Sequence, residues 1–166
     1  MGFTLDRLAA ECRRILEEDP GPSGRIRIRD LVQQVLEDRE FLATYLNDNT
    51  PERQVLYEDP ELGFCICAHM NRGPKESNPH DHGSSWAIYG QAIGETEMSD
   101  WEVLEPPADG RPGKVRRARV YTLKPGMAHL YNEGDVHSPR RAASTGLIRI
   151  EGKNTEKMKR AAYTAV

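Results

Sequence analysis

Two histidines stand one residue apart near the middle of the chain, and their spacing suits a metal site. His80 and His82 belong to "NPHDHGSSWAIYG", residues 78–90, in a chain with only five histidines. Residues i and i+2 of a strand point to the same face, so on a strand the two imidazoles project together. Imidazoles bind zinc, iron, copper and nickel. A surface pair in a turn is the alternative, because Pro79 and Gly83 favour turns.

A third ligand would decide between these alternatives, and the remaining histidines are the candidates. His137 lies in "NEGDVHSPRR", His129 in "KPGMAHLYNEG", and His69 upstream of the pair. A β barrel brings a downstream strand beside the strand of the pair. We therefore predict a metal site of His80, His82 and His137, and keep His129 as the alternative third ligand.

The segments around these histidines predict a β domain that follows helices. Residues 4–19 carry apolar side chains at helical spacing, and residues 28–46 do the same with a break at Asp38. After residue 49, short segments rich in β-branched and aromatic residues alternate with turn residues, which is typical of a sandwich or barrel. The sequence thus predicts a mainly β fold with an N-terminal helical segment.

The same pattern sets the expected domain organisation. We expect a helical segment over 1–49 packed on a β barrel over 50–166, in one structural domain. The Pro- and Gly-rich residues 105–114 are expected to form a hairpin tip or a flap. The basic run 114–119 is expected to guard an exposed edge strand, and residues 154–166 to close the chain as a short helix.

The composition narrows the classes of partner. A net charge of −3 favours neither nucleic acid nor an anionic membrane. There is no apolar run of membrane length and no signal-peptide core at the start. The three cysteines, Cys12, Cys65 and Cys67, are an odd number, and reduced thiols are the simplest interpretation. We therefore expect a cytoplasmic protein that could form a homodimer.

The motifs around the histidines resemble those of the cupins, and most of all the cysteine dioxygenase branch, the thiol dioxygenases. The likeness covers residues 50–154 or so, and the His-x-His block is its most specific part. The matching residues are His80-Asp81-His82, Gly90, Glu95-Thr96 and "GDVH" at 134–137. The resemblance implies a cupin-type double-stranded β-helix, a jelly-roll barrel. It also implies Fe(II), with zinc, nickel or manganese as alternatives, acting with O2 on a small anionic substrate.

The activity that the resemblance implies is oxidation of a small thiol carboxylate to a sulfinate. An arginine near the start of the family's β domain binds the carboxylate, and Arg53 stands in a similar place. Arg149 is a second candidate, and Glu151 stands beside it at another of the family's catalytic positions. Asp81 is expected to face away from the metal or to accept a hydrogen bond from a ligand imidazole. Tyr89 is expected to line the pocket or the core, as is Trp86.

Two departures separate the chain from the family pattern. Ser85, Trp86 and Ala87 occupy the places of the usual cupin glutamate, so the metal would have three neutral ligands. The family's Ser-x-His-x-Tyr triad on the last strand is also absent. One register puts Leu147, Arg149 and Glu151 at those places, and the other puts Gly146, Ile148 and Ile150 there. Neither register supplies the tyrosine.

Two other functions therefore remain open. One is a different metal cupin enzyme, a carbon-oxidising dioxygenase or a lyase that acts on a diketone or a carboxylic acid. The other is a non-catalytic cupin that binds a ligand. Metal content separates the last from the two enzymes, and oxygen uptake with a set of thiols separates the enzymes from each other.

Overall fold

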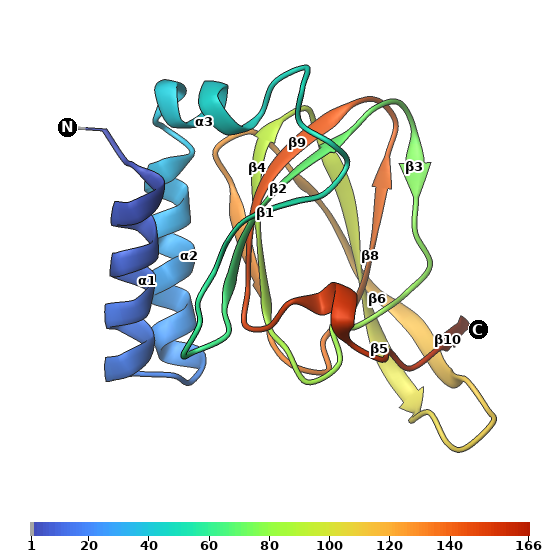
Figure 1. Cartoon of the computed structure of the whole chain (residues 1–166). Coiled ribbons are helices and arrows are strands. Elements are labelled where there is room, and N and C mark those ends of the chain that lie inside the picture. Colours follow the sequence, from blue (N-terminus) through green and yellow to red (C-terminus); the bar gives the residue numbers. More distant parts are fainter. Residues whose placement is uncertain (1) are drawn as a thin grey trace.

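Three helices precede the β domain and cover one side of it (Figure 1). The computed structural model describes residues 2–166. Helix α1 (Leu5–Glu18) begins after Thr4, whose hydroxyl accepts a hydrogen bond from the amide of Arg7. It confirms the helix predicted over 4–19. Among the described residues, no helix combines the length and the apolar character needed to cross a membrane.

The second predicted helix is divided in two, as the break at Asp38 indicated. Helix α2 (Pro22–Val35) begins earlier than predicted, because proline at the first helical position is compatible with a helix start. Helix α3 (Arg39–Tyr45) follows Asp38, whose carboxylate accepts hydrogen bonds from the amides of Phe41 and Phe3. Asp38 therefore starts one helix and holds the beginning of the chain against it.

Ten strands form two five-stranded sheets, in the orders β1-β2-β9-β4-β7 and β10-β6-β5-β8-β3. From β2 to β9 the chain changes sheets at every connection except the β5–β6 hairpin. This winding is a double-stranded β-helix of the cupin type, so the predicted fold class is confirmed. The strands are β1 (Gln54–Glu58), β2 (Cys65–Asn71), β3 (Lys75–Glu76), β4 (Ala87–Ile93), β5 (Thr96–Glu105), β6 (Gly113–Leu123), β7 (Ala128–Tyr131), β8 (Val136–Arg141), β9 (Thr145–Glu151) and β10 (Tyr163–Ala165).

The strands of the first sheet have one face toward the helices and one toward the barrel interior. Ile148 and Ile150 of β9 pack in the core shared with the helices, whereas Leu147 packs inside the barrel with Tyr89. Because alternate residues share a face, Leu147, Arg149 and Glu151 all point inward. Of the two registers considered for this strand, the one through Leu147 therefore faces the interior.

The C-terminal segment differs from the prediction. Instead of a helix over 154–166, it has a single 3-10 turn (Thr155–Lys157) and then β10, which pairs in parallel with the start of β6. The extended form satisfies backbone groups at the exposed edge of β6. It also brings the Tyr163 hydroxyl to 2.8 Å from the Asp81 carboxylate, to which it donates. These contacts outweigh the weak helical pattern.

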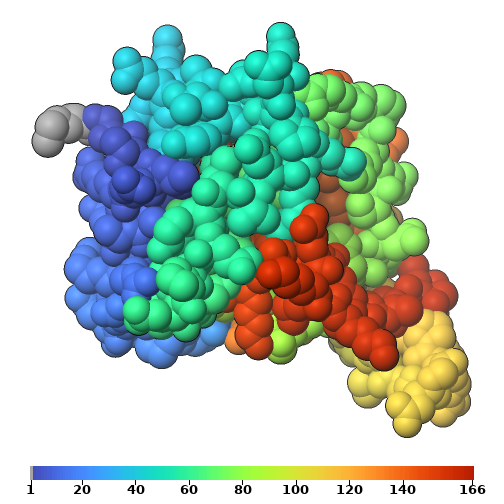
Figure 2. Space-filling model, viewed as in Figure 1, coloured from blue at the N-terminus to red at the C-terminus, as the bar shows by residue number. Residues whose placement is uncertain are grey.

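The Pro- and Gly-rich segment forms the tip of the β5–β6 hairpin, one of the two alternatives considered for it. The hairpin projects from the body of the molecule, in yellow in Figure 2. β10 pairs with β6 only as far as Val115. Along the remainder of this edge of β6, the described residues provide no neighbouring strand. Arg116 and Arg119 lie there and form ion pairs with Glu102 and Asp100 on β5, which agrees with a charged edge strand.

Candidate metal centre

The two histidines of the pair reach the barrel interior from a connection, not from a regular strand. His80 pairs with His137 of β8 through two backbone hydrogen bonds of 3.0 and 2.9 Å, an isolated bridge, and His82 precedes β4. The prediction that both lie on one strand is therefore wrong. The segment is held because Asp81 accepts a hydrogen bond from the amide of Gly83, whose φ of +60° is a conformation that glycine adopts readily.

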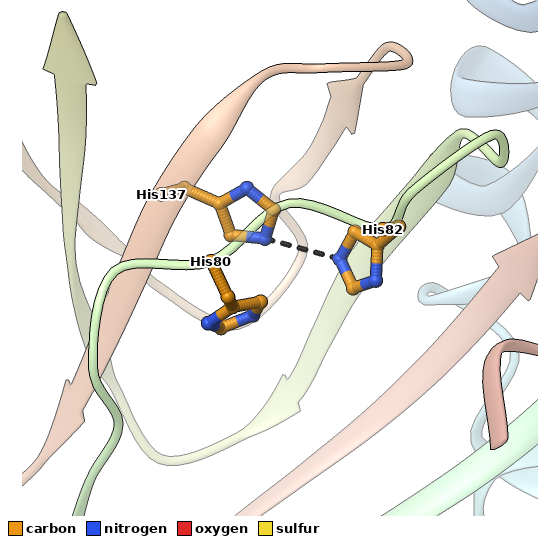
Figure 3. A group of neighbouring side chains, drawn as sticks. All are labelled: His80, His82 and His137. Carbon is orange, nitrogen blue, oxygen red and sulfur yellow. Dashed lines mark hydrogen bonds between the residues drawn. The ribbon is translucent and has the colours of Figure 1, made fainter. Parts of the chain in front are cut away.

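Three imidazoles nevertheless converge at one place, and we call His80, His82 and His137 the histidine triad. One ring nitrogen from each residue lies within 4.8 Å of the others, a grouping that could hold a metal ion. Figure 3 shows the rings gathered from the segment before β4 and from β8. The Nε2 atoms of His82 and His137 are 3.1 Å apart. The structure thus brings together the three residues that the sequence predicted as ligands.

Hydrogen bonds to the backbone fix which nitrogen two of these imidazoles can offer. The Nδ1 atoms of His80 and His137 lie 2.8 and 2.9 Å from the carbonyl oxygens of Asn78 and Asp135. A carbonyl can only accept, so each Nδ1 carries the proton and each Nε2 keeps its lone pair. The Nδ1 of buried His82 has no protein partner. Two lone pairs that face one region suit a cation.

The environment also keeps the imidazoles neutral, as metal binding requires. Burial lowers the pKa of all three, and the nearby charge of Arg149 lowers them further. The hydrogen bond from His137 to the carbonyl of Asp135 works in the opposite direction but does not outweigh burial. Neutral rings with free Nε2 lone pairs are the form that binds divalent transition metals. The residues therefore fit a metal ion, and nothing in them selects one metal.

The other two histidines lie outside the triad. His129 packs against the rings of Tyr121 and Tyr131, with centroids 5.0 and 4.6 Å away. His69 belongs to a second group with Cys67 and Glu151, whose ligand atoms also lie within 4.8 Å of one another. Arg53 and Arg149 already bind the carboxylate of Glu151, so a metal ion in this second group would be repelled by two positive charges.

Asp81 has a different environment from the one expected. It is buried, and its carboxylate accepts hydrogen bonds from Gly83 and Tyr163. Its partners include no imidazole, so the expected hydrogen bond to a ligand ring is wrong. That function belongs to the backbone carbonyls of Asn78 and Asp135. Such carbonyls are provided by any residue type, so the sequence carries no signal for them.

His80 and His82 of the triad line a cavity of about 470 Å³ whose walls are mainly polar side chains. The sequence-predicted Arg53 and Arg149 line it, and Glu151 lies directly behind them. Tyr89 also lines it, whereas Trp86 packs in the core shared with the helices. The lining residues are Glu52, Arg53, His69, Asn71, Lys75, Ser77, Asn78, His80, His82, Tyr89, Pro139, Arg141, Arg149 and Arg160. The chain is acidic overall, yet this cavity collects positive charge.

Arg53, Arg149 and Glu151 form a connected charge cluster on the inner wall. Two nitrogens of Arg53 lie 3.0 and 3.1 Å from the two carboxylate oxygens of Glu151, and Arg149 donates to the same carboxylate at 2.7 Å. Burial raises the pKa of Glu151, but the two arginines outweigh burial and hold it below its usual value. The cluster is therefore fully ionised. The Arg53 guanidinium is held by this contact and by Asn154, and its proposed contact with substrate stays a prediction.

Arg141 is the residue of this site that sequence reasoning missed. Arg141 lines the cavity and is only 7 % exposed. Within residues 2–166, its guanidinium forms no hydrogen bond and no ion pair. Burial is the main cause that lowers its pKa, although a guanidinium stays charged in proteins. The sequence contained a signal for Arg141. Residues 137, 139 and 141 of one strand share a face, so a strand that points His137 to the interior also points Arg141 there.

Comparisons with known proteins found similarity among solved structures only. No protein-family model and no curated protein matches the sequence. Among solved structures, a cupin superfamily protein from Desulfitobacterium hafniense is 9% identical and has a TM-score of 0.47 over 65% of this chain and 82% of its own. A double-stranded β-helix protein from Klebsiella pneumoniae is 16% identical, with a TM-score of 0.46 over 70% and 82%.

A third similar structure is that of an enzyme. The DMSP lyase of Ruegeria pomeroyi is 13% identical and has a TM-score of 0.46 over 66% of this chain and 50% of its own. All three TM-scores lie below 0.5, so the description of the fold rests on the strand topology of this chain. The geometry described above supports a chain with a cupin-type fold whose interior holds a candidate three-histidine metal centre.

Proposed function

We propose that the protein is a metal-dependent enzyme that uses O2 to oxidise a small thiol carboxylate to its sulfinate. The observation that carries the proposal is the convergence of the three imidazoles beside a cavity that is also lined by buried Arg141, to which residues 2–166 supply no ion pair. The triad would hold the metal, and Arg141 would bind the carboxylate. Arg53 and Arg149 line the same cavity.

The charge of the cavity supports an anionic substrate. The cavity is lined by four guanidinium groups, those of Arg53, Arg141, Arg149 and Arg160, and by Lys75. The carboxylates near it are that of Glu52 in its wall and that of buried Glu151, which Arg53 and Arg149 already bind. Burial of an unpaired charge is unfavourable. An anion that forms an ion pair with Arg141 would therefore remove an unfavourable free energy that is present in the protein without substrate. A cavity with walls of one sign also concentrates ions of the opposite sign.

The reaction balances with the substrates named. A thiol and O2 give a sulfinic acid, in which sulfur has gained both oxygen atoms and the thiol proton passes to the product or to solvent. An iron(II) ion held by three neutral imidazoles would supply the redox chemistry and favour the thiolate form. The chain itself would bind the carboxylate through Arg141 and orient the sulfur toward the triad.

The experiment uses iron-loaded protein and three thiols: cysteine, 3-mercaptopropionate and cysteamine. O2 consumption is compared with sulfinate formed. Cysteamine lacks a carboxylate and serves as the matched control, so the variant Arg141→Gln should raise KM by about tenfold to a hundredfold for the two acids and leave KM for cysteamine nearly unchanged. Iron content is measured for both proteins, because a change in metal occupancy would otherwise imitate a change in KM.

Two results would contradict the proposal. The absence of sulfinate from every thiol, with iron bound, would refute thiol oxidation and favour the carbon-oxidising or lyase alternative. An equal loss with acids and cysteamine would show that Arg141 does not recognise the carboxylate.

A further inference from the structure

The hydroxyl of Tyr89 lies beside the triad, at a position where a metal ligand would be expected. Its oxygen is 3.0 Å from the Nε2 of His82 and 3.2 Å from the Nε2 of His137, and those two nitrogens are 3.1 Å apart. The three atoms thus form a nearly equilateral triangle. Tyr89 is on β4, and the triad residues reach the same point from other segments.

The size of this triangle matches the face of a coordination sphere. Nitrogen and oxygen ligands lie about 2.0–2.1 Å from zinc, which separates them by about 3.3–3.4 Å in a tetrahedron. At adjacent corners of an octahedron the same bonds give about 2.8–3.0 Å. The observed separations fall between these values. A metal bound to the two nitrogens would therefore have the phenol oxygen within its coordination sphere.

The position of the phenol is held from both sides. Tyr89 is 2 % exposed, the guanidinium of Arg149 lies 4.3 Å from the centre of its ring, and the ring of Tyr131 packs 5.0 Å away. Within residues 2–166, the hydroxyl has hydrogen-bond partners only in the two triad nitrogens. A metal that takes both lone pairs removes both partners. A buried hydroxyl left without a partner is costly, and a bond to the metal would satisfy it.

We propose that Tyr89, as a phenolate, is the fourth protein ligand of this metal centre. The inference rests on the proposed metal site and deepens it, since it changes the ligand set from three neutral groups to three neutral groups and one anion. The phenolate would partly compensate the metal charge, which a carboxylate cannot do here because Ser85, Trp86 and Ala87 occupy the expected places.

The test uses the colour of the iron(III) form, because phenolate bound to iron(III) absorbs visible light by charge transfer. The protein is loaded with iron, oxidised, and its spectrum is recorded together with its iron content. Wild type is expected to be coloured, and the Tyr89→Phe variant to be colourless with iron still bound by the triad. The Tyr131→Phe variant is the matched control, since Tyr131 is buried and stacked on His137 at 3.9 Å, and it should keep the band.

A second measurement does not need iron. Tyr89→Phe should weaken Zn(II) binding, followed by competition with a chelator, by more than about tenfold, since even groups that only support ligands commonly cost that much. A colourless wild-type protein with iron bound, or a band that survives in Tyr89→Phe, would overturn the proposal while leaving the metal site intact. Wild-type protein that binds no iron at all would overturn both the metal site and this ligand.

Discussion

Replacement of Glu151 by glutamine should destabilise the folded protein strongly, because it leaves two largely covered arginines without their shared carboxylate. Glu151 is fully buried, and the side chains of Arg53 and Arg149 are only 15% and 12% exposed. Removal of one partner from a buried ion pair costs about 3–5 kcal/mol. For a domain of this size, 1 kcal/mol lowers Tm by about 2–4 °C. We therefore expect a decrease in Tm on the order of 10 °C.

Glu156 provides the matched control for this change. It forms an ion pair with the same arginine, Arg53, at 3.2 Å, but its side chain is 60% exposed. Exposed pairs contribute about 0–1 kcal/mol, so Glu156→Gln should change Tm by no more than about 3 °C. Thermal unfolding followed by circular dichroism measures both variants. Equal effects of the two substitutions would refute the reasoning that burial makes the Glu151 contacts strong.

The same residue predicts a dependence of stability on pH. The folded-state pKa of Glu151 lies below its usual value, so its contribution is present above the unfolded pKa of about 4.3 and is lost as the pH falls through the folded pKa. Wild type should therefore lose more stability than Glu151→Gln between about pH 4.5 and pH 3. Urea unfolding across this range tests the prediction, and parallel curves for the two proteins would contradict it.

Three further predictions concern the metal site and the packing around it. Alanine in place of any triad histidine should remove most of the bound metal, whereas the His129→Ala variant should retain it. Metal analysis of the purified proteins tests this prediction, and metal loss from the His129→Ala variant alone would refute our ligand set. Arg53→Ala should lower Tm and leave KM for an acid substrate nearly unchanged, because Glu151 already holds this guanidinium; an unchanged Tm with a much higher KM would return carboxylate binding to Arg53. Gly90→Ala should destabilise the protein by about 1–3 kcal/mol in urea unfolding, since a Cβ there would lie 2.6 Å from Val32 and 2.8 Å from the carbonyl of Ile148; a neutral effect would show that α2 is not held close to β4.

Local pattern in the sequence determined the kinds of element and the identity of the triad. Helical periodicity and an Asp at the break defined the N-terminal helices, and short β-rich segments indicated a barrel. The spacing of His80 and His82, joined to a later histidine, indicated the triad. The helices and the β barrel were predicted correctly because they depend on side-chain periodicity, which short segments of sequence carry by themselves. The three histidines do lie together, although the strand that was expected to carry His80 and His82 is not formed, and their binding of a metal stays a prediction.

Contacts between distant segments decided what the pattern could not. The C-terminal residues form a strand because the edge of β6 offers backbone partners, and residue periodicity does not record that edge. Arg53, just before β1, and Arg149 of β9 share Glu151 although they lie far apart in sequence, and within residues 2–166 buried Arg141 has no such carboxylate. The Tyr89 hydroxyl meets the triad only because β4 and β8 face each other across the barrel. Charge pairing and coordination geometry depend on separations of a few ångströms, and only the packed fold sets those separations.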